Sequence, residues 1–326
     1  MRSEIRTVHL GPDGRLLEET TDGLEPVPAD RLADHLAEEL TPPDWATDLV
    51  VYAHGWRTPP EDARAMADGL LACAAEQYAR EQALYPRLPE WRPWTVLLCW
   101  PSGKRRGMGE YRKMRDRAHA LSTDGHAGRV IGRLLGYLDV RRGDPAAPEV
   151  LATREGQYLH LVGHSFGCRV LCEAVQWAAE GPATLGWSMP RPPNRPFTAD
   201  SLLLFQMAAP RDAFETLFTA LDEAPLHGPV VATYAQADLA TGFWHVRAEK
   251  RAGVGHAGIG TAPAPVSGIR MRGTGEPYPH DALDHRFVSV DASDVFVHRR
   301  GWSGAHSDHV RPESAHLLLS LADHAR

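Results

Sequence analysis

The feature that most constrains this chain is a Gly-x-Ser-x-Gly pentapeptide between a strand pattern and a helix pattern. Residues 163–167 read GHSFG, and the run 158–162 before them (YLHLV) is rich in β-forming residues. The run 168–179 after them places its apolar side chains on one helical face. In this context the pentapeptide predicts a nucleophile elbow, a sharp turn that lifts the hydroxyl of Ser165 above a sheet. The start of the helix would direct N–H groups towards an anion formed there.

Composition narrows the class of protein. The 326 residues, 43% of them hydrophobic, are enough for one large α/β core or two modest ones. A formal net charge of −7 argues against binding nucleic acid through bulk electrostatics. No apolar run approaches the roughly 18 residues that span a bilayer, and the charged N-terminus lacks a signal-peptide core. Four cysteines make no disulfide framework at this length, which favours reduced thiols in a cytoplasmic protein.

Strand and helix patterns alternate along the chain, which predicts a mainly parallel sheet with helices on both faces. Residues 1–46 are expected to form an N-terminal extension, with a hairpin turning at 11–14 and a helix over 29–39. Residues 47–326 are expected to form the main domain, with loop insertions near 101–117, 181–200 and 246–285. Strands are predicted at 48–53, 94–100, 158–162, 201–207, 230–235 and 286–290, and helices at 60–82, 118–139, 168–179 and 311–325.

A serine needs a general base to become a good nucleophile, and the base needs an acid that orients it. In parallel sheets such groups gather at the carboxyl ends of the strands, and after an elbow the acid precedes the histidine along the chain. Asp238 follows the 230–235 strand within a few residues and is the first candidate for the acid. Asp212, which follows the preceding strand, is its rival.

The base should lie between the last strand and the last helix. Among seventeen histidines, His306 meets this condition best. His309 is a close rival, whereas His285 and His298 flank the last strand.

An oxyanion hole needs two N–H donors aimed at the developing charge. One is expected to be the backbone N–H of Phe166, directly after the nucleophile. The loop after the 48–53 strand, with the sequence His54-Gly55-Trp56, is expected to supply the Trp56 N–H as the other. His54 itself is interpreted as a residue that shapes this loop.

Taken together, these patterns resemble the α/β-hydrolase superfamily, and more narrowly a bacterial group of poorly characterised serine hydrolases with His-Gly-aromatic and Trp-Pro-Ser turns. The resemblance covers roughly residues 48–310, and its order along the chain supports Ser165, Asp238 and His306 as the triad. It departs from the group at Phe166, where methionine is common, in the spacing of 111–116, and at 181–200, which looks like an insertion. The matching stretches are 50–56 (VVYAHGW), 99–103 (CWPSG), 161–167 (LVGHSFG), 233–238 (TYAQAD), 251–253 (RAG) and 290–293 (VDAS), followed by His306.

Three further segments could lie near the site. The basic stretch 104–117 could overhang the site and favour an anionic substrate, although a solvated basic surface accounts for it more simply. The Pro-rich stretch 182–196 could form a lid or an ordered surface loop. The stretch 246–285 is expected to be an irregular excursion near the site. Its His280-Asp281 and Asp284-His285 pairs, like His306-x-Asp308-His309 further along the chain, could suggest metal ligands, but they match no recognised metal spacing.

The sequence therefore predicts a serine hydrolase that acts on a carboxylic ester or related small-molecule acyl substrate through an acyl-enzyme, without a cofactor or metal. Two alternatives stay open. The same acyl-enzyme could pass its acyl group to an alcohol or amine, which would make the protein an acyltransferase. The fold could also be catalytically idle and serve in binding.

Overall fold

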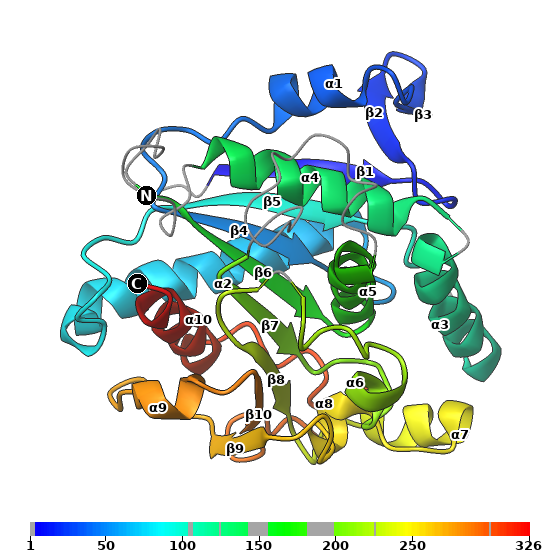
Figure 1. The fold of residues 1–326 in the computed structure, drawn as a ribbon. Coiled ribbons are helices and arrows are strands. Elements are labelled where there is room, and N and C mark those ends of the chain that lie inside the picture. The colour runs from blue at the N-terminus through cyan, green and yellow to red at the C-terminus, as the bar shows by residue number, and fades with distance from the viewer. Residues whose placement is uncertain are drawn as a thin grey trace.

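A computed structural model describes residues 4–103, 107–123, 125–142, 156–180, 199–224, 226–299 and 301–326. In these residues, ten strands form one sheet in the order β3-β2-β1-β5-β4-β6-β7-β8-β10-β9 (Figure 1). Among the described strand pairs, only β1–β2 and β2–β3 are antiparallel. The strands are β1 (Glu4–Leu10), β2 (Leu16–Thr20), β3 (Gly23–Pro26), β4 (Asp48–Ala53), β5 (Pro93–Cys99), β6 (Tyr158–His164), β7 (Ser201–Phe205), β8 (Val230–Tyr234), β9 (Val266–Arg270) and β10 (Phe287–Asp291). The predicted α/β class with a mainly parallel sheet is thus confirmed.

Helices cover both faces of this sheet. The central strands β4 and β5 are buried along their whole length, as expected of strands covered on both sides. One apolar cluster joins the sheet to α2 and α10, and the other joins it to α1, α3, α4 and α5. The longer helices are α1 (Leu32–Glu39), α2 (Pro60–Glu81), α3 (Met108–Thr123), α4 (Ala127–Arg141), α5 (Phe166–Glu180) and α10 (Pro312–His324). The short ones are η1 (Gln82–Leu84), α6 (Ala213–Thr216), the π-helix η4 (Ala240–Trp244), α7 (His245–Glu249), α8 (Val254–Ala257) and α9 (His280–Leu283).

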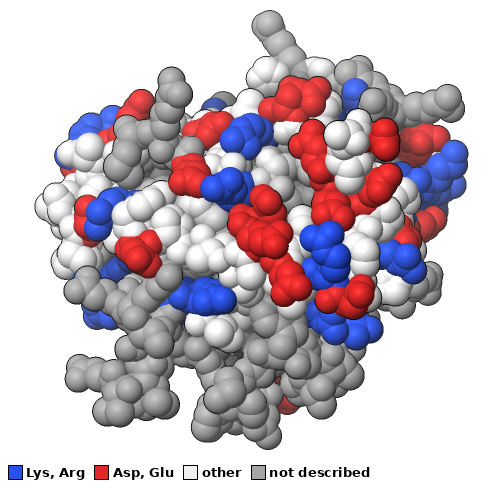
Figure 2. Space-filling model, turned by 90° about the horizontal axis from the view of Figure 1, so that it is seen from above, with Lys and Arg blue, Asp and Glu red and all other residues white. Residues whose placement is uncertain are grey.

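The N-terminal segment extends the sheet. The predicted hairpin is present, because β1 pairs with β2 in antiparallel fashion across the turn at 11–14. Strand β1 also pairs in parallel with β5, so the hairpin continues the main sheet at one edge. Seven acidic residues and one arginine lie between positions 19 and 39. Figure 2, which shows the molecule from above, shows many acidic side chains on the face in view, with lysine and arginine side chains among them.

Two predictions for individual elements were wrong. The helix expected over 118–139 is divided into α3 and α4, because the chain turns at Gly125 against the N-terminal hairpin. A methyl group at Gly125 would lie 2.5 Å from the carbonyl oxygen of Asp13, and the His126 N–H donates to that same oxygen. The segment 246–285 is also more regular than expected, since it contains three short helices or helical turns and β9, which pairs in parallel with β10.

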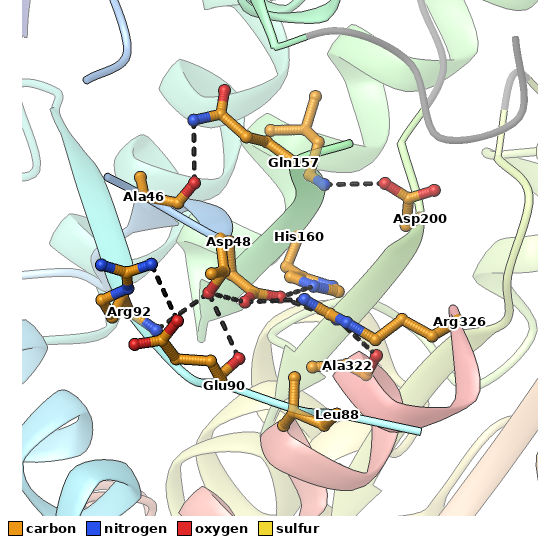
Figure 3. Close-up of polar contacts among 12 residues, drawn as sticks. Ala46, Asp48, Leu88, Glu90, Arg92, Gln157, His160, Asp200, Ala322 and Arg326 are labelled. Atoms are coloured by element: carbon orange, nitrogen blue, oxygen red, sulfur yellow. Dashed lines mark hydrogen bonds and ion pairs between the residues drawn. The ribbon is translucent and has the colours of Figure 1, made fainter. Parts of the chain in front are cut away.

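A buried ionic cluster lies at the amino ends of the strands (Figure 3). Asp48, the first residue of β4, accepts hydrogen bonds from both terminal nitrogens of Arg326, each at 3.0 Å. His160 of β6 contacts the same carboxylate through Nε2 at 3.1 Å. The guanidinium of Arg326 also stacks on the ring of Tyr158, 3.9 Å from its centroid. These contacts join the end of α10 to the sheet, far from Ser165 at the carboxyl end of β6.

Within the described ranges, no helix combines the length and the apolar character needed to cross a bilayer. The Pro-rich stretch 182–196, interpreted from sequence as a lid or a surface loop, lies outside the described residues.

Candidate active site

Ser165 occupies a tight turn between β6 and α5. Its φ angle is +55°, in the left-handed region that residues other than glycine rarely adopt. Backbone hydrogen bonds hold it there: the Ser165 N–H donates to Phe205 at 3.0 Å, and its carbonyl accepts from Ala208 at 3.1 Å. An unusual backbone conformation held by several hydrogen bonds is typical of functional positions. The strand, the turn and the helix thus have the arrangement that the pentapeptide predicts.

Both glycines of the pentapeptide are required by close contacts. A methyl group at Gly163 would lie 2.8 Å from the Cα of Cys168, in the first turn of α5. A methyl group at Gly167 would lie only 2.2 Å from the carbonyl oxygen of Ala53, at the end of β4. Any larger residue would push α5 away from the sheet and move Ser165 with it.

Ser165, His306 and Asp238 form a continuous chain of hydrogen bonds. The Ser165 hydroxyl lies 2.7 Å from His306 Nε2 and can donate to it. His306 Nδ1 lies 2.8 Å from Asp238 Oδ2, and since a carboxylate only accepts, the proton belongs on Nδ1. Asp238 is fully buried and His306 is mostly buried. The structure therefore brings together the three residues proposed from sequence, which are separated by 68 and 73 positions along the chain.

Two further donors hold the Asp238 carboxylate. The Thr241 N–H donates to Oδ1 at 3.0 Å, and the side-chain amide of Gln206 donates to Oδ2 at 3.3 Å. Gln206 Nε2 also donates to the carbonyl of Ala305 at 2.7 Å, so it connects the acid to the loop that carries His306. Gln206 directly follows β7, but nothing in the sequence pattern distinguished it from other strand-end residues.

The alternative candidates for the acid and for the base lie outside this chain of hydrogen bonds. Asp212 pairs with Arg251 and makes no contact with His306. His309 is buried beneath the site, where its Nε2 shares a hydrogen bond of 3.0 Å with the Tyr52 hydroxyl. His285 and His298 have no hydrogen bond to Ser165 or Asp238 in the described structure.

The loop after β4 borders the serine, as its sequence predicts. A methyl group at Gly55 would lie 2.9 Å from Ser165 Cβ, so only glycine allows this approach. His54 Nδ1–H donates to the Gly55 carbonyl at 2.9 Å, and its Nε2 accepts from the Trp100 N–H at 3.3 Å. Burial lowers the pKa of His54 to about 4, so the ring is uncharged near neutral pH. His54 therefore shapes the loop, in agreement with its interpretation from sequence.

The Trp-Pro-Ser turn at 100–102 also holds this loop in place through hydrogen bonds. Trp100 Nε1–H donates to the His54 carbonyl at 2.8 Å, and the Arg57 N–H donates to the Ser102 carbonyl at 3.1 Å. The side chain of Ser102 donates in turn to the Thr58 carbonyl at 3.3 Å. Within the described chain, neither the Trp56 N–H nor the Phe166 N–H donates to a backbone carbonyl. Both N–H groups therefore remain available beside Ser165.

A cavity of about 520 Å³ opens above the serine. Aromatic side chains form one wall, where the ring of Trp56 contacts Tyr111 edge-on at 5.7 Å and Trp302 at 5.5 Å between centroids. Met66 and Val310 contribute to the aliphatic part of the lining. A mostly apolar cavity with a few convergent polar groups is typical of a small-molecule site. Sequence patterns do not identify Tyr111 or Trp302 as wall residues, because both come from segments far from the motif.

Residues 104–106 of the basic stretch 104–117 lie outside the described residues, and the remainder lies largely along α3, where three basic side chains have local partners. Lys113 pairs with Glu110 at 2.9 Å, and Arg115 pairs with Asp116 at 2.6 Å. Arg117 donates to the carbonyl of Pro101 at 3.2 Å. These contacts favour the interpretation as a solvated basic surface.

Two of the residues considered as metal ligands, His280 and Asp284, have protein partners. His280 Nε2 lies 3.1 Å from Asp323, and Asp284 Oδ1 lies 3.4 Å from His324 Nε2. Across the described ranges, no group of three or more His, Cys, Asp or Glu side chains has an arrangement suited to a metal ion.

No protein-family model matches the chain, and no curated protein matches its sequence. The case for a function therefore depends on the geometry of the site.

Proposed function

We propose that this protein is a serine hydrolase of the α/β-hydrolase fold that cleaves a carboxylic ester or a related small-molecule acyl substrate. The observation that carries the proposal is the chain of hydrogen bonds from Ser165 through His306 to the buried Asp238, at the floor of a cavity. The parallel sheet, the left-handed serine and the glycine contacts of the turn support the same assignment. Carboxylesterase or lipase-like activity is the first choice, because it needs no group beyond these.

In the first step, Ser165 Oγ attacks the carbonyl carbon of the ester while His306 Nε2 takes the hydroxyl proton. The resulting imidazolium keeps its Nδ1–H on Asp238, whose negative charge stabilises it. The tetrahedral intermediate then collapses: the C–O bond to the alcohol breaks, and His306 returns the proton to the leaving oxygen. The products are the free alcohol and an ester of Ser165.

The charge on the carbonyl oxygen develops beside the N–H groups of Phe166 and Trp56. Phe166 is the first residue of α5, so its N–H is among those that have no partner within the helix. Trp56 lies on the loop that the close contact at Gly55 holds against Ser165. Removal of one such donor costs about 10²- to 10³-fold in kcat in enzymes of this kind.

In the second step, water replaces the alcohol. His306 Nε2 takes a proton from the water, the hydroxide adds to the acyl carbon, and the bond to Ser165 Oγ breaks as the proton returns to the serine. The carboxylic acid leaves and the enzyme is restored. The four free cysteines, three of them buried, support the cytoplasmic location that we propose for the enzyme.

Labelling with a fluorophosphonate probe tests the proposal. We expect rapid labelling of the wild type and loss of labelling in Ser165→Ala and His306→Ala, with circular dichroism showing that both variants fold. A screen of short p-nitrophenyl esters and thioesters would then identify the acyl preference. A folded wild type that neither labels nor hydrolyses these esters would contradict the proposal and favour a binding role.

Product analysis separates hydrolysis from acyl transfer. When an alcohol or amine competes with water for the acyl-enzyme, a hydrolase gives mainly the free acid. Acid formation that disappears in favour of a new ester or amide would instead identify an acyltransferase.

A further inference from the structure

The residue that precedes the serine contacts both halves of the proposed site. His164 Nε2 lies 2.7 Å from the backbone carbonyl oxygen of His306. On its other side, His164 Nδ1 lies against the loop after β4, where a methyl group at Gly55 would be only 2.9 Å away. The imidazole therefore fills the space between the loop of the base and the loop of the oxyanion site.

We infer that His164 is a positioning residue for the base, holding the backbone of His306 so that its Nε2 meets the Ser165 hydroxyl. The inference rests on the proposed function, because it assigns His164 a role in that reaction. A carbonyl oxygen only accepts, so His164 carries its proton on Nε2 and donates it to His306. This hydrogen bond fixes the main chain of the residue whose side chain lies 2.7 Å from Ser165 Oγ.

A second imidazole prevents His164 from turning away. The ring of His309 stacks on that of His164, with centroids 4.1 Å apart and planes inclined by 21°. His309 is held by Tyr52 on β4, and its ring also stacks on Phe205 of β7, with centroids 5.3 Å apart. Both rings are buried, so a change of rotamer would have to displace the sheet side chains beneath them.

The charge states of His164 and His309 suit the positioning of His306. Burial lowers the pKa of His164 well below its ordinary value and that of His309 to about 3, so both rings are uncharged near neutral pH. His306 becomes an imidazolium during the reaction, and its ring centroid lies 5.0 Å from that of His164. An uncharged neighbour can position the base without repelling this cation.

Paired substitutions test the inference. His164→Gln and His164→Met have side chains of similar size, but only glutamine keeps an N–H donor for the His306 carbonyl. We expect kcat for a short p-nitrophenyl ester, per folded molecule, to fall about 10- to 100-fold in His164→Met with KM little changed. His164→Gln should recover a large part of that loss. If His164→Met does not fold, His164→Phe serves as the variant without a donor.

His316→Phe is the matched control. His316 is also a buried histidine that donates to a backbone carbonyl, that of Glu276 at 2.8 Å, but it lies on α10 outside the site. We expect this variant to lose stability while keeping kcat within about twofold of the wild type. Equal kcat in the wild type and the folded variant without a donor, or equal losses in the glutamine and methionine variants, would overturn the inference.

Proton NMR gives a readout that does not depend on turnover. The proton shared by His306 Nδ1 and Asp238 should give a strongly deshielded signal, retained in His164→Gln and shifted or broadened in His164→Met. If the wild type neither labels nor turns over ester, the proposed function fails, yet this comparison still decides whether His164 positions His306. An identical signal in all three proteins would refute the positioning role.

Discussion

Asp238→Asn provides a demanding test of the proposed triad, because the structure dictates how the new amide must lie. Oδ1 of Asp238 accepts a hydrogen bond from the Thr241 N–H at 3.0 Å. In the variant, the Thr241 N–H still needs an acceptor, so the asparagine oxygen should take the place of Oδ1. The asparagine NH₂ then lies where Oδ2 was, next to His306 Nδ1. As a donor, it requires His306 to accept at Nδ1 and to carry its proton on Nε2.

A proton on Nε2 faces the Ser165 hydroxyl across 2.7 Å and leaves no lone pair to take the serine proton. The wrong tautomer of a triad histidine costs about 10⁴-fold in kcat, which corresponds to about 5 kcal/mol of transition-state stabilisation. Gln206 reinforces the effect on stability, because its own NH₂ donates towards Oδ2 at 3.3 Å and would meet a second donor. We therefore expect a folded but somewhat less stable variant with almost no activity.

The assay is kcat for a short p-nitrophenyl ester, together with the rate of fluorophosphonate labelling, compared between the wild type and Asp238→Asn. Asp212→Asn is the matched control, since Asp212 is the acid that lies outside the site and pairs with Arg251. We expect its kcat to stay close to that of the wild type. The reasoning would be refuted if Asp238→Asn kept its activity within about tenfold, or if Asp212→Asn lost more activity than Asp238→Asn.

Three predictions concern stability, each measured as the free energy of urea unfolding. Gly167→Ala places a methyl group 2.2 Å from the Ala53 carbonyl oxygen and should cost about 1–3 kcal/mol or more; an unchanged value would show that α5 can shift freely. Arg326→Ala leaves the buried Asp48 carboxylate with only His160 and the Thr47 hydroxyl as side-chain partners and should cost about 3 kcal/mol, whereas a loss below ~1 kcal/mol would mean that solvent reaches the carboxylate. Acidification should destabilise the fold, because the pKa of His54 is lowered to about 4 from an ordinary value of 6.5 and the unfolded chain therefore binds more protons between these values. The contribution of His54 to the free energy of unfolding is fully present above pH 6.5 and decreases as the pH falls towards 4, by about 1.4 kcal/mol per pH unit. A free energy of unfolding that does not change over this pH range would contradict the burial of a neutral ring.

The sequence was sufficient for the class of fold and for the surroundings of Ser165, because both depend on local patterns. Runs of β-forming residues such as 48–53 and 158–162 predict buried parallel strands without knowledge of their neighbours. The elbow is likewise recognised within a few residues, from its two glycines between a strand pattern and a helix pattern. Gly163 is required by a contact within the turn, with Cys168, whereas Gly167 is required by the Ala53 carbonyl oxygen on β4. The helix boundary at Gly125 was missed, because it depends on the hairpin at Asp13, more than one hundred positions away.

For the proposed site, the sequence narrowed the candidates and the tertiary structure chose among them. Asp212 and Asp238 both follow buried strands by a few residues, so the sequence favoured Asp238 but kept Asp212 as a rival. The fold turns Asp212 towards Arg251 and buries Asp238 against His306.

The contact between His164 and the backbone of His306 joins residues 142 positions apart, and no local sequence pattern predicts it. Periodicity reports which face of an element is buried, so it can predict strands, helices and the order of loops at the ends of a sheet. It cannot report which loops meet, because that depends on how the whole sheet twists and packs. The sequence by itself therefore determined the glycine turn at Ser165, the sheet that presents it and the order of preference among the candidate residues. Only the tertiary structure decided which aspartate and which histidine join Ser165 in one chain of hydrogen bonds, and that His164 contacts the backbone of that histidine.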